Sequence, residues 1–144
     1  GTFDLIYASH ILEHCHRRMV TATLHHWREM LKEGGVLRLA VPNFKAIMER
    51  YLETEDLKEL LGLLYGGQDH PRNNHFIVFD DITLSEHLRK AGFQNIHEWN
   101  WRETEHAAFD DYASCYLPCD PATRKPLDKE HGLLMSLNLE AVNP

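Results

Sequence analysis

Short apolar runs and one helical repeat organise the first third of the chain. Residues 3–8 form a short apolar run, and residues 36–41 form a second, nearly continuous one. Such runs are typical of strands covered on both faces. Between them, residues 18–32 repeat apolar side chains every three or four positions and lead into Gly34-Gly35, which predicts an amphipathic helix with a glycine stop. The pattern indicates a right-handed strand–helix–strand unit with parallel strands.

Helix-capping residues recur in the middle of the chain. Asn43 is expected to cap a helix over residues 44–52, and Thr54 is expected to cap a second, leucine-rich helix. Thr83 and Glu86 have the spacing of a capping box, which predicts the start of a third helix.

The last third of the chain combines two predicted strands with a segment of a different kind. Residues 93–101 are rich in Trp and Ile and predict a strand. Residues 102–131 show no clear period and contain three prolines, so we expect an ordered insertion without a core element. Residues 133–141 alternate apolar and polar side chains, which predicts a half-buried antiparallel strand. An α/β fold with a mixed sheet follows.

Composition narrows the class of protein. The 144 residues are 43% hydrophobic and 26% charged, which is typical of one folded soluble domain. Acidic residues outnumber basic ones by 22 to 15, so a broad basic surface for duplex DNA is not expected. No stretch approaches the roughly 20 apolar residues of a membrane span, and no secretory signal is visible. We therefore predict a cytoplasmic protein without a membrane partner.

The cysteines predict no disulfide framework. There are only three, Cys15, Cys115 and Cys119, and an odd number favours reduced thiols. Cys115 and Cys119 have C-x3-C spacing, but no second pair follows to complete the four ligands of a structural zinc site.

The segment "DLIYASHILEHCH", residues 4–16, carries the candidate chemistry. His10, Glu13 and His14 have the H-x-x-E-H spacing of one class of zinc protease, but that motif needs a long helix, and a strand is predicted to end just before it. In a second interpretation, the segment follows a parallel strand at the edge where open α/β sheets bind ligands. In a third, the histidines only shape a loop, and Glu13 is an acid at a helix start.

The order of these pieces resembles a class I S-adenosylmethionine-dependent methyltransferase of the type 11-like kind. "FDLIYASHILEH" resembles the fourth strand of that fold and the loop after it, and "LKEGGVLRLAVP" resembles the fifth strand. "HLRKAGFQNI" resembles the helix entering the sixth strand, and "GLLMSLNLEAV" resembles the antiparallel seventh. The resemblance implies the C-terminal half of a Rossmann-like mixed sheet, with the strand order fourth, fifth, seventh, sixth.

The glycine-rich cofactor loop of that family would lie before Gly1. We therefore expect residues 1–144 to form a partial methyltransferase domain, with an insertion at about 102–131, in a longer chain. The implied function is S-adenosylmethionine-dependent methyl transfer to a small-molecule or glycan-type acceptor, shaped by residues 44–75 and 102–131.

The resemblance also implies roles for individual residues. S-adenosylmethionine would bind beside Ala8, Ser9 and His10, and His10 or His14 would act as a catalytic base. With an unperturbed pKa near neutrality, histidine suits that task when the acceptor is a hydroxyl.

A divalent metal is a further expectation at the same segment. The sequence resembles the E-x-x-E-H element with which small-RNA 2′-O-methyltransferases and ubiquinone-pathway O-methyltransferases hold a cation. Glu13 and His14 match that element, His10 replaces its first Glu, and His75 is a further candidate ligand. Imidazole in place of carboxylate favours zinc, iron or nickel over magnesium.

A second class of function stays open. Without the cofactor loop, the chain fits a non-catalytic interaction module derived from a methyltransferase. The strand at residues 3–8 would then have an unpaired edge, and symmetric pairing of two such edges would give a homodimer.

Overall fold

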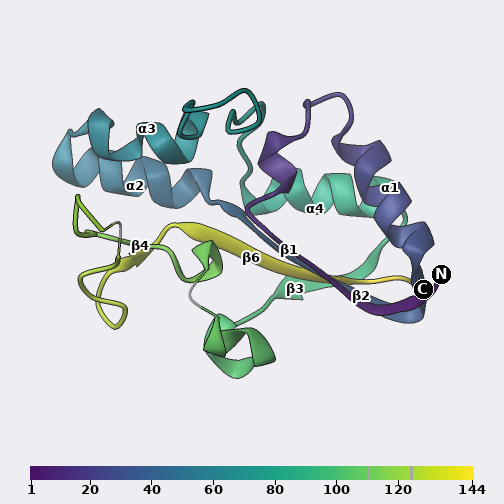
Figure 1. Cartoon of the computed structure of the whole chain (residues 1–144). Coiled ribbons are helices and arrows are strands. Elements are labelled where there is room, and N and C mark those ends of the chain that lie inside the picture. The colour runs from purple at the N-terminus through teal and green to yellow at the C-terminus, as the bar shows by residue number, and fades with distance from the viewer. Residues whose placement is uncertain (110, 124) are drawn as a thin grey trace.

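The computed structural model describes residues 1–109, 111–123 and 125–144. Its centre is a four-stranded mixed sheet in the order β1 (Phe3–Ser9), β2 (Leu31–Pro42), β6 (Ser136–Val142) and β3 (Gln94–Glu98) (Figure 1). β1 and β2 are parallel, and β6 runs antiparallel to both β2 and β3. The predicted strand order, with the last strand antiparallel between its neighbours, is confirmed.

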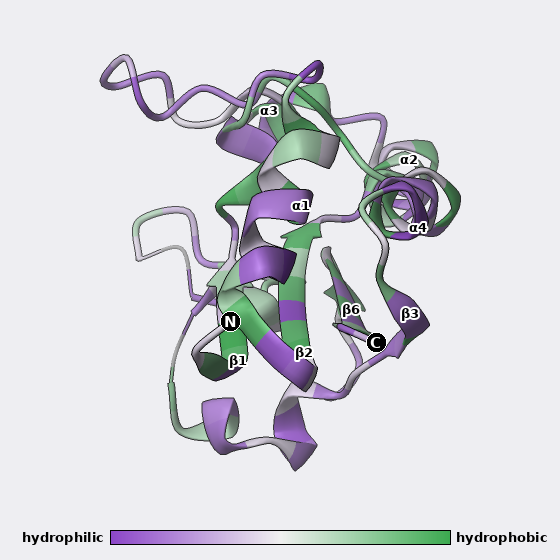
Figure 2. Cartoon of the chain, turned by 90° about the vertical axis from the view of Figure 1, so that its right-hand side faces the viewer, coloured by the Kyte–Doolittle hydropathy of each residue, from purple (hydrophilic) through white to green (hydrophobic). Residues whose placement is uncertain are grey.

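One face of the sheet is covered by α1 (Val20–Met30) and α4 (Asp81–Lys90) (Figure 1). Hydrophobic residues follow β2 along much of its length (Figure 2). Alternate residues of β2 and β6 join the helices in the main core, where all of them are buried: Leu37, Leu39, Val41, Leu137, Leu139 and Ala141. The two-residue period of these strands therefore produces the apolar face that the sequence predicted.

The opposite face is covered by three short 3-10 helices, η2 (Trp101–Glu103), η3 (Glu105–Ala108) and η4 (Tyr112–Ser114). Ala113 packs there against Ala40 and Trp99, and the Trp99 indole N–H donates to the Leu39 carbonyl oxygen at 2.8 Å. Residues 102–131, which are expected to be an ordered insertion without a core element, therefore contribute buried side chains to this face. The sequence does not show this contribution because short 3-10 turns have no apolar period to detect.

Two further helices, α2 (Phe44–Thr54) and α3 (Leu57–Tyr65), lie beyond the end of β2 (Figure 1). The side chain of Asn43 caps α2 as predicted, accepting from the Lys45 N–H at 3.1 Å. The two helices share a second apolar cluster with a small ladder of β4 (Tyr116–Leu117) and β5 (Leu133–Leu134).

Two predicted caps are corrected by the structure. Thr54 is the last residue of α2, where its hydroxyl donates to the Arg50 carbonyl oxygen, and Asp56 caps α3 instead. The capping box of α4 joins Asp80 and Thr83, not Thr83 and Glu86, because the Asp80 carboxylate accepts the Thr83 N–H at 2.8 Å. Carboxylate and hydroxyl side chains are both good caps, so sequence spacing alone does not select between them.

The start of the sheet also differs from the prediction. Among the described strands, β1 lies at the edge of the sheet, and only Ala8 of its residues is fully buried, so its two faces are less completely covered than predicted. Helix α1 ends at Met30, and β2 begins at Leu31 because Leu31 pairs with Phe3. The expected glycine stop of the helix is therefore wrong: Gly34 has a φ of 75° and lies in an irregular stretch of β2.

The strand predicted over residues 93–101 is shorter in the structure, where β3 covers only residues 94–98. Cys15 and Cys119 are free thiols. In the part of the chain that the structure describes, no helix has the length and apolar character needed to span a bilayer.

Candidate functional site

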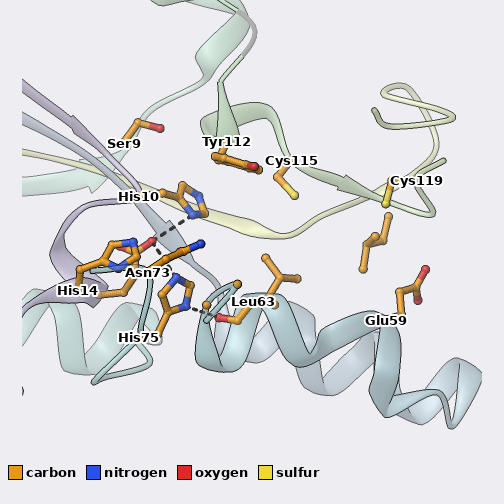
Figure 3. Close-up of a pocket in the computed structure, with 15 residues that line it drawn as sticks. Ser9, His10, His14, Glu59, Leu63, Asn73, His75, Tyr112, Cys115 and Cys119 are labelled. Carbon is orange, nitrogen blue, oxygen red and sulfur yellow. Dashed lines mark hydrogen bonds and ion pairs between the residues drawn. The ribbon is translucent and has the colours of Figure 1, made fainter. Parts of the chain in front are cut away.

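A cavity of about 410 Å³ lies where β1 ends, between the η1 turn (Leu12–His14), the end of α3 and the η4 segment. Figure 3 shows His10, His14 and His75 gathered on one side and Cys119 and Glu59 on the other. The volume falls within the range of small-molecule sites. Its lining comprises Ser9, His10, Glu13, His14, Glu59, Gly62, Leu63, Gly66, Gly67, Asn73, His75, Tyr112, Cys115, Leu117 and Cys119.

His10 is held firmly at the end of β1. Its backbone φ is 51°, a left-handed conformation that costs a non-glycine residue about 1 kcal/mol or more. Its N–H donates to the Ala40 carbonyl oxygen of β2 at 2.7 Å. On the side-chain end, Nε2 lies 3.2 Å from the Ser136 hydroxyl of β6, and the ring lies 5.4 Å from that of Tyr112. Three parts of the fold therefore fix its imidazole at the cavity wall.

The two residues before His10 differ in their surroundings. Ser9 lines the cavity, and its hydroxyl is buried. Ala8 is 3% exposed and packs into the main core, so its side chain does not reach the cavity. Of the three predicted cofactor-binding residues, Ser9 and His10 lie at the cavity.

Glu13 is the centre of a cluster of titratable groups. Its side chain is completely buried, and neither carboxylate oxygen has a hydrogen bond within the described part of the chain. One oxygen lies 3.2 Å from His10 Nδ1 and 3.9 Å from His75 Nε2. The rings of His14 and His75 meet edge to face, with centroids 4.7 Å apart. A donor atom from each of Glu13, His14 and His75 lies within 4.8 Å of the others.

Backbone carbonyl groups orient two of these rings. His14 Nδ1 lies 3.1 Å from the Asn74 carbonyl oxygen, and His75 Nδ1 lies 2.9 Å from the Leu63 carbonyl oxygen. A carbonyl oxygen only accepts, so Nδ1 carries the proton and Nε2 of the neutral ring keeps its lone pair. Burial lowers the pKa of His75, which keeps that ring neutral near pH 7.

The geometry excludes one of the three interpretations of the segment. His10 follows a strand, and only Leu12–His14 form a short 3-10 turn, so the long helix of a zinc protease is absent from this segment. Glu13 lies in the first turn of η1, as the third interpretation expects of an acid at a helix start, although its side chain is buried. The predicted metal ligands converge in part: Glu13, His14 and His75 form one group, and His10 adjoins it through its contact with Glu13.

Comparison with known proteins identifies the family. The sequence profile described as a methyltransferase domain matches residues 1–98. This chain belongs to that family. It is a class I S-adenosylmethionine-dependent methyltransferase domain, as its resemblance predicted. No curated protein sequence matches the chain.

Two solved structures share the fold of this methyltransferase domain. A candidate O-methyltransferase from Nostoc punctiforme matches 99% of the chain with a TM-score of 0.53 and 13% identity. A candidate exported protein from Bordetella parapertussis matches 99% with a TM-score of 0.54 and 16% identity. The chain spans only 32% and 39% of the lengths of these two proteins.

Several cavity residues of the methyltransferase domain were not singled out by sequence. Tyr112 and Asn73 lie within the two ranges expected to shape the acceptor, but no local pattern marks them individually. The cysteines at 115 and 119 also line the cavity, and among the described residues neither belongs to a group of three metal donors. Their placement depends on chain segments that meet only in the folded state.

Proposed function

We propose that this domain transfers a methyl group from S-adenosylmethionine to a hydroxyl of a small-molecule or glycan-type acceptor, as part of a longer polypeptide. The observation that carries the proposal is the position of His10. It lies at the carboxyl end of a parallel strand, which is where open α/β sheets bind their ligands, and it faces a cavity of about 410 Å³. Family membership supports the cofactor.

The residues at this edge fit the cofactor. Ser9 offers a buried hydroxyl at the cavity, and His10 presents its ring to the same cavity. Bound S-adenosylmethionine would supply a sulfonium methyl group for an in-line displacement. The domain itself contributes by orienting the acceptor and excluding water, which is how most of the rate of such a step is gained.

His10 is the favoured base for the acceptor hydroxyl, and His14 is the other candidate. The carboxylate of Glu13 lies 3.2 Å from His10 Nδ1, so it would stabilise the imidazolium that forms when His10 takes a proton. His14 has its Nδ1 at a carbonyl oxygen, so only its Nε2 could accept a proton. Tyr112, Cys115 and Cys119 would border the acceptor from other parts of the wall.

Calorimetric titration of S-adenosylmethionine into the full-length protein tests the cofactor site. A Ser9→Trp variant should lose affinity at least about tenfold, because the indole would fill space beside His10. Thr2→Trp, an exposed change near the other end of β1, is the matched control and should bind like the wild type. Unchanged affinity in Ser9→Trp would exclude a cofactor at this edge.

A His10→Gln variant separates catalysis from binding. It should keep its affinity for S-adenosylmethionine and lose turnover by roughly 100-fold or more, the usual contribution of a general base. Turnover equal to the wild type would remove His10 from the reaction and leave His14 as the candidate.

One observation favours a second candidate function, an interaction module that pairs through β1. Among the described residues, β1 pairs with β2 on one side and with no strand on the other. An open edge of this kind is suited to adding a strand from another copy. Mass measurement over a dilution series should then show a dimer that Leu5→Lys weakens, whereas Leu127→Lys, at a 65% exposed position away from the edge, should not. A monomer at every concentration would reject pairing through this strand.

A further inference from the structure

The carboxylate of Glu59 lines the end of the cavity opposite the histidines (Figure 3). Its two oxygens accept hydrogen bonds from the Arg50 guanidinium, one from Nε at 2.8 Å and the other from Nη2 at 3.2 Å. Arg50 lies on α2 and Glu59 on α3, and their side chains are only 14% and 22% exposed. Because a planar guanidinium bonds both oxygens at once, this pair fixes the orientation of the carboxylate at the cavity wall.

The ion pair uses only part of the capacity of Glu59 to accept hydrogen bonds. An ionised carboxylate has about four lone-pair positions, two on each oxygen, and Arg50 occupies one on each. A ligand can therefore still donate one hydrogen bond to each oxygen. The guanidinium offsets the negative charge of Glu59 and would repel a cationic ligand. Uncharged hydroxyl groups are the donors that suit this position.

The helix that carries Glu59 also has a glycine that faces the cavity. Gly62 lies in the interior of α3, three positions after Glu59, so the two residues share one side of the helix. Glycine inside a helix is destabilising relative to alanine. A methyl group at position 62 would meet no atom within 4 Å, so packing within the described part of the chain does not require glycine there. Close approach of a ligand to the helix would account for it.

The wall between the two ends of the cavity includes apolar side chains. Leu63 lies between Glu59 and the histidines (Figure 3), and Leu117 lines the same cavity. Both leucines pack in the second apolar cluster. Ligand sites of this kind bind an apolar surface along the wall and use a few polar groups to fix the orientation.

We propose that Glu59 binds two neighbouring hydroxyl groups of the methyl acceptor, one on each carboxylate oxygen, while the acceptor lies against Gly62 and presents another hydroxyl to His10. The acceptor class is a small polyol with an apolar face, such as a sugar ring. Glu59 is a specificity residue, which selects the acceptor and takes no part in the transfer step. The hydroxyl at His10 rests on the proposed function, whereas diol binding at Glu59 does not.

Binding of simple diols to the full-length protein, without S-adenosylmethionine, tests the proposal. In NMR titrations, cis-1,2-cyclohexanediol should bind at least about tenfold more tightly than cyclohexanol or cis-1,4-cyclohexanediol, because only neighbouring hydroxyls reach both oxygens. Glu59→Gln should remove this preference, since the amide has one oxygen in place of two. Glu53→Gln is the matched control: Glu53 also pairs with Arg50, at 3.1 Å, but its side chain is 67% exposed and does not line the cavity. It should bind like the wild type.

Gly62→Ala is a second variant with opposite effects on stability and binding. It should raise the melting temperature, because alanine favours a helix, and weaken binding of cis-1,2-cyclohexanediol by about tenfold, because the added methyl group occupies space that the ligand needs. A merely structural role of this glycine would not weaken binding. If Glu59→Gln does not fold, as judged by circular dichroism, Gly62→Ala decides the test alone.

Four results would each overturn the proposal. They are no binding or no preference for the 1,2-diol in the wild type, an unchanged preference in folded Glu59→Gln, an equal loss in Glu53→Gln, and unchanged binding in Gly62→Ala. Failure of S-adenosylmethionine to bind would instead reject the proposed function and would leave the diol measurements as they are.

Discussion

The two faces of the sheet are held by different kinds of contact, apolar packing on one and ion pairs and hydrogen bonds on the other. On the face of α1 and α4, leucine, valine and alanine side chains from β2 and β6 are buried in one apolar core. On the other face, the same two strands present Arg38 and Glu140, which form an ion pair, and Tyr7 donates to the Asp111 carboxylate at 2.6 Å. Arg38 also lies over the Trp99 ring at 5.2 Å.

This difference shows two ways in which helices and loops stabilise a sheet. The apolar face is stabilised by area removed from water, which is non-directional and follows from periodicity. The polar face depends on specific partners, because a buried polar group without its partner is destabilising. Each face should therefore respond differently to substitution and to pH.

The largest expected effect is on the apolar face. Leu139 is 1% exposed, and Leu139→Ala should lower the free energy of unfolding by about 2–5 kcal/mol through lost transfer energy and the cavity left behind. Leu127→Ala, at a side chain 65% exposed, is the control and should change it by less than about 0.5 kcal/mol. Urea unfolding measures both, and equal effects would contradict the assignment of this face as the core.

A smaller effect is expected on the polar face. Tyr7→Phe removes the hydroxyl that donates to Asp111, and should lower the free energy of unfolding by about 1–2 kcal/mol at pH 7. Tyr65→Phe, at an exposed ring, should have almost no effect. A Tyr7→Phe protein as stable as the wild type would show that this contact is neutral.

The polar face should also respond to alkaline pH. Burial, followed by the hydrogen bond to Asp111, raises the pKa of Tyr7 above its ordinary value of 10.0. The folded state then keeps a proton that the unfolded state releases, so this contribution is complete below about pH 10 and is lost as the pH rises further. Between pH 8 and 11, the free energy of unfolding should fall more steeply with pH for the wild type than for Tyr7→Phe. The same pH dependence in both proteins would refute a contribution of the Tyr7 proton to stability.

The smallest effect concerns how α4 is fixed on the apolar face. Asp80→Ala removes the observed cap and should lower the free energy of unfolding by about 1 kcal/mol, whereas Glu86→Ala, at the position predicted from spacing, should have little effect. The hydrogen bonds to Thr83 lower the pKa of Asp80 below 3.8, so its contribution is present above about pH 4 and lost on acidification. A larger loss of unfolding free energy in Glu86→Ala than in Asp80→Ala would favour Thr83 and Glu86 as the capping box.

The same contrast explains what the sequence predicts well. Residues 36–41 and 133–141 carry clear patterns, and their strands, pairing and common apolar face could be predicted. The caps at Asp56 and Asp80 could not, because nearby side chains compete for the same N–H groups. Neither could the polar face, since Asp111 meets Tyr7 from 104 positions away without any local signal.

The candidate site divides in the same way. His10, Glu13 and His14 are neighbours in the sequence, so their proximity follows from the segment itself. His75 was named only through a resemblance, and its placement depends on backbone hydrogen bonds to Glu13 and Tyr65. Tyr112 and Ser136 complete the surroundings of His10 from distant segments, which is a result of tertiary structure.

The left-handed backbone of His10 has a consequence for protein engineering. Glycine adopts a φ of 51° without the strain that histidine incurs, so His10→Gly would relieve it there at some loss of packing. Glu13→Gln would likewise relieve a buried charge. A directed-evolution campaign that selects only for heat resistance would therefore favour both changes. It would remove the imidazole and the carboxylate from the cavity while raising the stability of the domain. Libraries built on this domain should keep positions 10 and 13 fixed and seek stability elsewhere.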